Sequence, residues 1–339
     1  MTGILLLGIA HGLSDAAAGF AVGVLIQRSS ADGGLLIFLY NGLAFGLQPV
    51  AGLLLDRLNQ SHKGAAFGLV MASIGLAIFW LNSLLGILLI GFGSAFFHAG
   101  GGAVSILNSP GKASGPGVFA AFGVIGLVIG IRLSFTYAVS MATSFSALLI
   151  ILAGIIWFIR SPSNDPAGNI RILSGYEIAI ILILAAFALR SFIWTGVDRG
   201  VDGTTSLALF IGFSAGFGKL VGGFLSDRIG WLKWTFLSLT GAALSLAFAR
   251  DLDIALLIGV FLLQSVTGLT ISWLGRVLPD SPAFAASLAL GAAVILGGLP
   301  FAFTNGAWFG ATAILVSLPL SLLGYWMVLR ESAEESVMN

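Results

Sequence analysis

Gly52-Leu-Leu-Leu-Asp-Arg57 and Gly223-Phe-Leu-Ser-Asp-Arg228 are two copies of one short pattern in a chain of 339 residues. Each copy follows a long apolar stretch, precedes another, and has a lysine shortly after it, Lys63 or Lys233. The second copy begins about half a chain length after the first. A repeat at this distance predicts a molecule made of two similar halves arranged in parallel.

The composition predicts an integral membrane protein. The chain is 58% hydrophobic and 9% charged, with a mean hydropathy of +1.06, which is more apolar surface than a soluble domain can bury. A net charge of +1 gives no case for nucleic acid as a partner. The absence of cysteine excludes disulfides and thiolate metal sites, and no nucleotide-binding Gly-x-x-x-x-Gly-Lys motif occurs.

Apolar stretches of about 20 residues, the length that crosses a bilayer, predict twelve membrane-spanning helices. Charges, prolines and polar clusters place them at 3–27, 34–55, 64–81, 83–107, 116–137, 141–159, 174–196, 204–226, 232–249, 253–275, 283–303 and 306–329. The fold class is therefore an all-α membrane protein of two pseudo-symmetric six-helix bundles. We expect bundles at 1–160 and 174–330, a cytoplasmic linker at 161–173 and an acidic cytoplasmic tail at 331–339.

The loop charges predict the orientation, because cytoplasmic loops carry an excess of Lys and Arg. With a cytoplasmic N-terminus, nine basic residues fall inside: Arg57, Lys63, Lys112, Arg160, Arg171, Arg228, Lys233, Arg276 and Arg330. Only Arg28, Arg199 and Arg250 fall outside. Both termini are thus predicted to be cytoplasmic, in a multi-pass protein of the plasma (inner) membrane.

These features resemble the major facilitator superfamily of transporters over the whole chain. Twelve spans, two six-helix halves and a Gly-x-x-x-Asp-Arg loop after spans two and eight are typical of that family. The resemblance implies a monomeric carrier that works by alternating access. It also implies that the first, fourth, seventh and tenth helices of the twelve line the substrate path.

Within that family, the first half is most similar to the fosmidomycin-resistance group of drug exporters. The matching segments are 8–15, which contains His11 and Asp15, the pair Gln48-Pro49, and 91–98, which ends at His98. Three positions depart from the pattern: Ile87 replaces an arginine, Ile131 replaces a proline, and Ala99-Gly100 replaces a Pro-Glu pair. Each departure weakens the case for proton-coupled drug export.

Ionisable residues inside the spans are candidate functional residues, because a charge at the bilayer centre costs at least about 2.5–3.5 kcal/mol. His11 and Asp15 are four residues apart and share one helix face, where an imidazole beside a carboxylate can hold a proton. His98 lies midway along its span. A proton or substrate site is one interpretation of these three residues, and hydrogen bonding between neighbouring helices is the other.

Three cations and two amides complete the candidate set. Lys219 and Gln48 each lie eight residues before the aspartate of an Asp-Arg loop, so the same repeat position is polar twice. Arg132 is predicted to bind an anionic group through its guanidinium fork. Arg190 is predicted to bind substrate, or to act at the outer gate with Asp198 or Asp202, and Gln264 is placed in the substrate path. The excess of cations favours an anionic solute.

The Asp-Arg loops (residues 52–57 and 223–228) are predicted to gate the carrier. In the family that the chain resembles, the aspartate pairs with neighbouring helix ends and holds one conformation. The gating residues are Gly52, Asp56, Arg57, Gly223, Asp227 and Arg228. The alternative is ordinary positive charge at the cytoplasmic ends of helices.

The sequence therefore predicts a secondary transporter, not an enzyme, that moves a small anionic or amphiphilic organic solute with possible coupling to protons. The expected partners are a small-molecule substrate, protons and the lipid bilayer, with no cofactor and no metal site. An uncoupled anion uniporter or exchanger is an alternative, and so is a transporter-like membrane sensor or lipid-handling protein.

Overall fold

The computed structural model describes residues 2–28, 31–136, 139–158, 175–201, 205–302 and 310–338, so the expected linker at 161–173 lies outside the described residues. The first half comprises α1 (Thr2–Arg28), α2 (Ala31–Asn41), the π-helix η1 (Gly42–Gly46), α3 (Gln48–Leu58), α4 (Ser61–Ile78), α5 (Ser83–Leu107), α6 (Ser114–Ser134) and α7 (Val139–Trp157). The second half comprises α8 (Glu177–Arg199), α9 (Ser206–Ile229), α10 (Trp231–Phe248), α11 (Asp253–Gln264), α12 (Thr267–Val277), α13 (Pro282–Ser287), the π-helix η2 (Leu288–Ala292), α14 (Ala293–Gly298), the 3₁₀-helix η3 (Leu299–Ala302) and α15 (Ala311–Met338).

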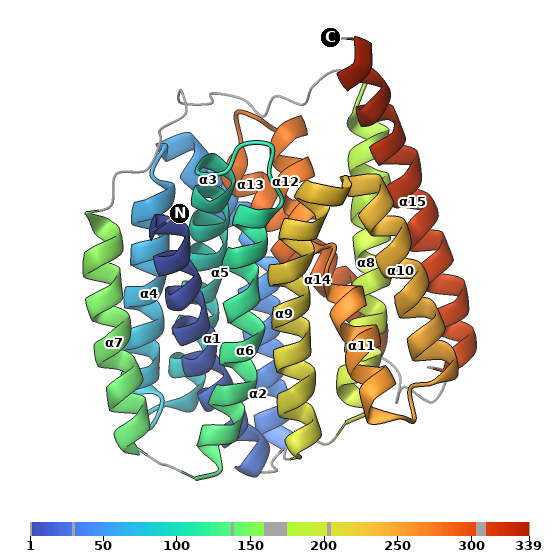
Figure 1. Cartoon of the computed structure of the whole chain (residues 1–339). Helices are drawn as coiled ribbons and strands as arrows, with labels where there is room; N and C mark the ends of the chain where they lie inside the picture. Colours follow the sequence, from blue (N-terminus) through green and yellow to red (C-terminus); the bar gives the residue numbers. More distant parts are fainter. Residues whose placement is uncertain are drawn as a thin grey trace.

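The helices confirm a multi-pass membrane protein. Eleven helical segments in the described part of the chain are long and apolar enough to cross a membrane. The remaining predicted span, 232–249, corresponds to α10, whose first turn carries Trp231, Lys233 and Trp234 and is therefore less apolar. Because α10 packs along α15 and α11 in the second half, it occupies the place expected of that span (Figure 1). The count of twelve crossings stays a prediction.

Three predicted spans are not continuous α-helices. The span at 34–55 contains η1 between α2 and α3, and the span at 283–303 contains η2 between α13 and α14. A π-helical segment places one extra residue in a helix and is frequent at functional sites. The span at 253–275 is interrupted at residues 265–266, between α11 and α12. The two π-helices contact each other across the boundary between the halves.

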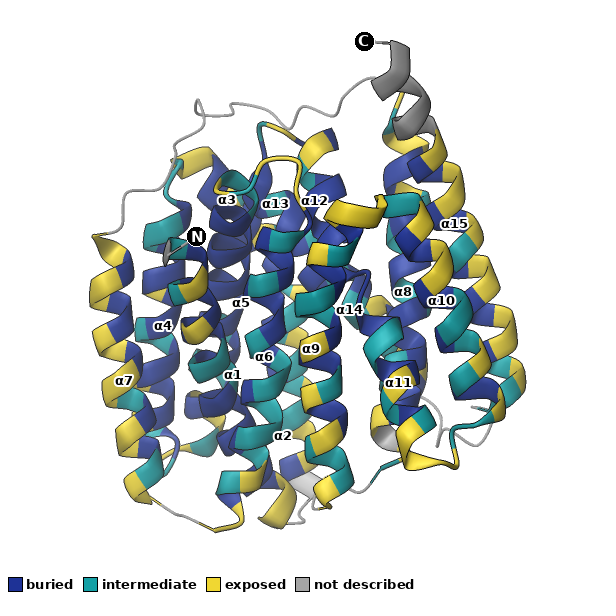
Figure 2. Ribbon diagram, in the orientation of Figure 1, coloured by how far each residue is buried: buried dark blue, intermediate teal, exposed yellow. Residues whose placement is uncertain are grey.

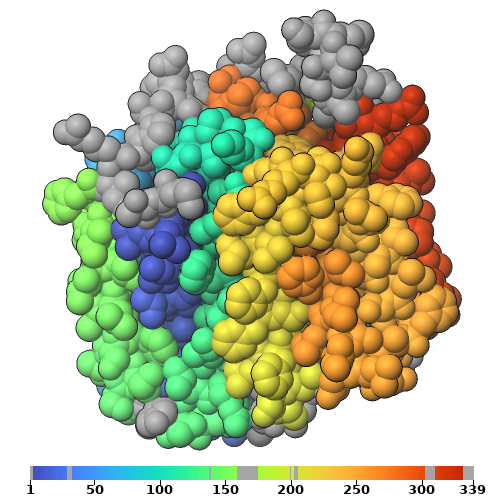
Figure 3. Space-filling view, viewed as in Figure 1, coloured from blue at the N-terminus to red at the C-terminus, as the bar shows by residue number. Residues whose placement is uncertain are grey.

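The two halves lie side by side, with α1 to α7 in one and α8 to α15 in the other (Figures 1 and 3). α1 begins and α15 ends at the same end of the bundle, where the turn after α3 also lies (Figure 1). Figure 2 shows exposed residues along the outer helices α7, α10 and α15, whereas α5 is largely buried. The exposed residues of the outer helices include Ile151, Leu244 and Leu320, which is the pattern of a lipid-facing surface.

Glycine lets the two most closely packed helices, α1 and α6, approach each other. A Cβ atom at Gly126 would collide with the backbone of Gly12, and one at Gly130 would collide with the backbone of Ala16. Close approach at small residues drives helix association in membranes, where burial of apolar surface supplies little. This contact fixes α6 against the part of α1 that carries His11 and Asp15.

A leucine at position 126 should therefore destabilise the protein. Overpacking of a close contact costs about 1–3 kcal/mol, and here the obstacle is backbone that has no room to move. We expect Gly126→Leu to lower the apparent melting temperature of the detergent-solubilised protein. Gly154→Leu is the matched control, since nothing lies within 4 Å of a Cβ at Gly154. Equal melting temperatures for the two variants would show that the α1–α6 contact does not determine the stability of the protein.

Candidate functional site

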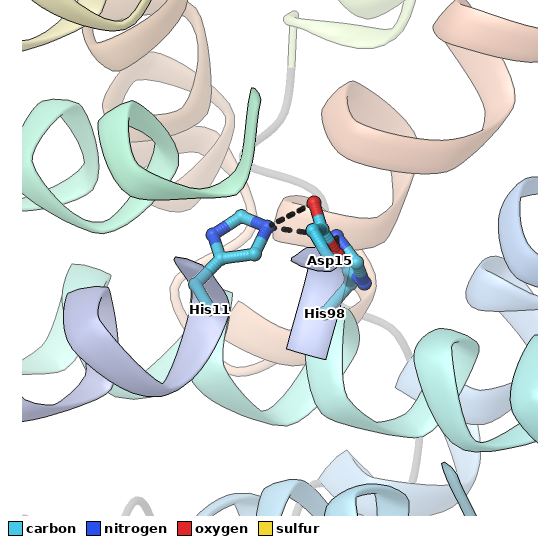
Figure 4. A group of neighbouring side chains, drawn as sticks. All are labelled: His11, Asp15 and His98. Atoms are coloured by element: carbon cyan, nitrogen blue, oxygen red, sulfur yellow. Dashed lines mark hydrogen bonds and ion pairs between the residues drawn. The ribbon is translucent and has the colours of Figure 1, made fainter. Parts of the chain in front are cut away.

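His11, Asp15 and His98 form a buried cluster, called here the His–Asp–His cluster (Figure 4). The Nε2 atom of His11 lies 2.8 Å from the Nε2 atom of His98 and 3.3 Å from Oδ2 of Asp15. The Nε2 atom of His98 lies 3.6 Å from Oδ1 of Asp15. Both histidines are at least 95% buried, and the Asp15 side chain is 14% exposed. The structure thus brings together three residues that the sequence identified separately.

Three helices position this cluster. The i, i+4 spacing on α1 places His11 and Asp15 on one face, as predicted, and α5 supplies His98. α6 passes directly behind them: a Cβ at Gly123 would meet Nε2 of His11 and Oδ2 of Asp15. The Phe119 ring stacks on the His11 ring at a centroid distance of 4.4 Å. Gly123 is therefore required by the space that the cluster occupies.

The hydrogen bonds of the two imidazoles are suited to a proton shared between the two rings. Nδ1 of His11 lies 2.8 Å from the Phe119 carbonyl oxygen, and Nδ1 of His98 lies 2.8 Å from the Ser94 carbonyl oxygen. A carbonyl only accepts, so Nδ1 of His11 donates to Phe119. Nδ1 of His98 also lies 3.2 Å from the Ser94 hydroxyl, and where it donates to the nearer Ser94 carbonyl, a neutral His98 ring leaves Nε2 as an acceptor. Two acceptor nitrogens at 2.8 Å beside a carboxylate repel one another. One proton on either Nε2 converts this repulsion into an N–H···N bond next to the carboxylate.

The same three residues offer ligand atoms that lie within 4.8 Å of one another, a group that no metal-binding motif in the sequence indicated. A tetrahedral zinc ion with bonds of about 2.0–2.1 Å would hold two histidine nitrogens about 3.4 Å apart. The observed separation of 2.8 Å is that of a direct hydrogen bond. The geometry therefore fits a shared proton better than a metal ion.

The second half contributes cations to the same region. Lys219 of α9 lies within electrostatic range of Asp15, of His98 and of Arg190 on α8. Among the described residues, its ammonium group has no hydrogen-bond or ion-pair partner. Negative charge in the first half and positive charge in the second therefore face each other across the boundary between the halves.

Arg190 has partners other than the predicted ones. Its guanidinium is 97% buried, and Nη1 donates to the Leu263 carbonyl oxygen at 3.1 Å and to Oε1 of Gln264 at 3.0 Å. No hydrogen bond or ion pair joins Arg190 to Asp198 in the structure, and Asp202 lies outside the described residues. The structure brings Arg190 and Gln264 together, and their place in the substrate path stays a prediction.

Two predicted site residues lie elsewhere. Gln48 is fully buried at the start of α3, donates to the Ala44 carbonyl oxygen at 2.7 Å, and packs against Gly291 of η2. It belongs to the contact between the halves and not to the His–Asp–His cluster. Arg132 is exposed in the last turn of α6. An exposed position at a helix end does not support the predicted role of Arg132 in the centre of the substrate path.

Two tyrosines in the site were not predicted. Tyr40 is buried in α2 within hydrogen-bonding reach of Ser94, and it lies close to Asp15. Tyr325 is buried in α15, where its hydroxyl lies 2.6 Å from Oγ1 of Thr270 and beside Arg190. A single tyrosine inside an apolar span is the signal that would have identified both, since a buried hydroxyl needs a partner.

The Asp-Arg loops form two cross-half contacts, called here the aspartate clamps. Asp56, at the end of α3, accepts hydrogen bonds from the backbone N–H groups of Ala283 and Phe284 at 2.9 and 2.8 Å, at the start of α13. Asp227, near the end of α9, accepts from Ala113 and Ser114 at 2.7 and 3.0 Å, at the start of α6. Each carboxylate caps a helix of the opposite half, where unpaired N–H groups favour negative charge.

The glycine of each motif allows the clamp to close. A Cβ at Gly52 would lie 2.6 Å from the Ala283 carbonyl oxygen, and one at Gly223 would lie 2.8 Å from the Ala113 carbonyl oxygen. Arg57 and Arg228 are exposed and make no hydrogen bond or ion pair to the described residues. The glycine and aspartate of the repeat therefore have a structural explanation, and the arginine remains consistent with the loop-charge rule.

The arrangement of the helices in two bundles is also found in solved structures of transporters. Neither a protein-family model nor a curated protein sequence matches the chain. A crystal structure of a variant of the E. coli fucose:proton symporter FucP matches with a TM-score of 0.71 at 16% identity, over 97% of this chain and 98% of that one. FucP in the outward conformation matches with a TM-score of 0.70 at 14% identity, over 97% of both chains.

At these identities the likeness shows the fold. The chain has the major facilitator fold, as its repeated motif predicted. The narrower resemblance to the fosmidomycin-resistance group is supported by neither comparison and stays a prediction.

The clamps should control access to the interior from the end where they lie. Asp56→Asn and Asp227→Asn each retain the side-chain shape but lose the charge, and a hydrogen bond to a charged group contributes about 1.5–3 kcal/mol. The chain has no cysteine, so the substitution Ser287→Cys introduces a single site for maleimide labelling. Ser287 is fully buried beside Gly52, so labelling there reports access to the clamp. We expect Asp56→Asn to raise the rate of maleimide labelling at this reporter by about tenfold or more.

Asp253→Asn is the matched control, since Asp253 also lies in the first turn of a helix but holds no clamp. Its labelling rate should equal that of the parent reporter protein. An unchanged rate in the Asp56→Asn variant would contradict a gating role for that clamp.

Proposed function

We propose that this protein is a secondary transporter that couples the movement of a small organic anion to protons by alternating access. The observation that carries the proposal is the His–Asp–His cluster, in which two imidazole nitrogens 2.8 Å apart are placed to share a proton beside Asp15. Ionisable residues inside membrane spans commonly mark proton relays in transporters. The major facilitator fold supplies the two halves that such a mechanism needs.

The cations of the second half support an anionic cargo. Lys219 and Arg190 are close enough to each other to repel, and Lys219 is not paired by hydrogen bond or ion pair with any described residue. An anion placed near them would relieve that repulsion. The groups that face the cluster, Tyr40 from α2 and Lys219 from α9, then connect the proton site to the anion site.

The clamps suggest which step of the cycle the structure represents. Both clamps are closed at the end of the bundle where α1 begins and α15 ends (Figure 1). The loop charges predict that this end is cytoplasmic, so the proposed state is closed to the cytoplasm. In the proposed cycle, this state is the one in which the cluster carries the proton. Opening of the clamps and loss of the proton would then accompany delivery of the anion to the cytoplasm, or its uptake there for export.

A neutral solute is the second candidate cargo, since the structurally similar FucP is a fucose:proton symporter. The proposal for an anion rests on the two cations, which a neutral sugar would leave without a counter-charge. The uncoupled carrier and the membrane sensor remain as the alternatives that experiments have to separate.

Loss of the carboxylate should abolish coupling. Proteoliposomes that contain a trapped pH-sensitive dye would be exposed to lactate, succinate, gluconate, phosphate and fucose, and the internal pH followed. We expect at least one anion to move protons through the unmodified protein and Asp15→Asn to reduce that movement more than tenfold. Without the carboxylate, the shared proton between His11 and His98 loses its counter-charge.

Asp253→Asn again serves as the control and should retain full proton movement. Solute flux without any pH change would favour the uncoupled alternative, and binding without flux would favour the sensor. Movement of fucose but of no anion would overturn the proposal for the cargo.

A smaller change tests the geometry of the cluster. Gly123→Ala keeps all three side chains but places a methyl group against His11 and Asp15. We expect proton movement to fall about tenfold or more, while Gly154→Ala, in open space on α7, leaves it unchanged. Full activity in the Gly123→Ala variant would show that the spacing of the three groups does not matter.

A further inference from the structure

The guanidinium of Arg190 is held by several neighbours but leaves one donor unused. Nη1 donates to the Leu263 carbonyl oxygen and to Oε1 of Gln264, the Tyr325 hydroxyl is within hydrogen-bonding reach, and the centroid of the Phe187 ring lies 3.8 Å from the central carbon. The Nε atom is buried and has no hydrogen-bond partner among the described residues. A buried donor without a partner is rare in folded proteins and calls for an explanation.

The interruption between α11 and α12 explains how Nη1 of Arg190 is held. A helix end leaves carbonyl oxygens without their usual N–H partners. Here the Leu263 carbonyl accepts from Arg190, and the Gln264 carbonyl accepts from Oγ1 of Thr267 at 2.8 Å. Arg190 therefore caps a broken membrane helix through one nitrogen, and this fixes the plane and direction of its remaining edge.

Because residue 264 is a glutamine and not a glutamate, it binds Arg190 without neutralising its positive charge. Gln264 supplies a neutral acceptor at 3.0 Å, where a glutamate would form an ion pair with Arg190. No ion pair joins Arg190 to a carboxylate of the described residues. A buried, uncompensated charge is costly, and a protein retains it where a ligand will neutralise it.

We infer that the Nε edge of Arg190 binds the oxyanion head group of the cargo, a carboxylate or a phosphate. Arginine characteristically contacts planar or tetrahedral oxyanions through two neighbouring N–H groups. Gln264 is the positioning residue that keeps this edge available, and Lys219 is a second point charge near it. The identity of this oxyanion as the transported cargo rests on the proposed function.

Equilibrium binding to the purified full-length chain tests the inference without any transport step. Thermal-shift titrations would give dissociation constants for lactate, succinate, phosphate and methylphosphonate, with fucose as the uncharged comparison. The carboxylate and phosphate arms identify which oxyanion is bound. We expect at least one oxyanion to bind and Arg190→Lys, which keeps the charge but loses the fork, to weaken it about tenfold or more.

Variants of Gln264 separate a positioning role from a merely structural one. Gln264→Glu adds a carboxylate that competes with the ligand, whereas Gln264→Leu only removes an acceptor. We expect Gln264→Glu to weaken oxyanion binding more than Gln264→Leu does, although it is closer in shape to the native residue. Gln27→Glu makes the same change at an exposed residue near the end of α1 and should leave the dissociation constant unchanged.

Oxyanion binding that is equally tight in the Arg190→Lys and Gln264→Glu proteins would overturn this inference, and so would binding of fucose but of no oxyanion. The first result would leave the proposed transport function intact, because proton movement in the liposome assay depends on the His–Asp–His cluster. Conversely, oxyanion binding that follows the expected order without any proton movement would support the Arg190 site and overturn the coupled function.

Discussion

The cap that each half places on a helix of the other half is the interaction on which the arrangement of this protein depends. The first N–H groups of a helix have no partner within the helix, and leaving such a group buried and unsatisfied costs about 1–3 kcal/mol. Asp56 and Asp227 supply acceptors to α13 and α6 from across the boundary. These contacts hold the two halves together. As a result, the His–Asp–His cluster on α1 and α5 faces Lys219 on α9.

The two halves share an architecture but carry different chemistry. The first half holds the histidines and Asp15, to which the proposed function assigns the proton, and the second holds the two cationic side chains, Arg190 and Lys219. Duplicated halves would start with equivalent positions, and the clamps have kept that equivalence. The interior positions have diverged, as Gln48 and Lys219 show: the first binds its own helix backbone, while the second lies in range of the cluster.

The sequence predicted those features that depend on local pattern. Apolar length placed the spans, the repeat predicted two halves, and the i, i+4 spacing placed His11 beside Asp15. The contact of His98 with that pair was beyond prediction, because it depends on how α5 packs against α1 and on Gly123 leaving room. Arg190 was identified as a candidate, but its direction depends on the break between α11 and α12, which no proline marks. Tyr40 and Tyr325 were missed because a tyrosine in a membrane span carries no charge to attract attention.

The paired π-helices η1 and η2 have a consequence for how this chain tolerates insertions and deletions. Each residue turns an α-helix by about 100°. The extra residue of η1 therefore determines the direction in which every side chain of α3 points. Asp56 meets the start of α13 only because that rotation has been made. A one-residue deletion within 42–46 would turn the Asp56 carboxylate by about 100° around the axis of α3 and away from the start of α13. The length of η1 is therefore as important to this clamp as the aspartate itself.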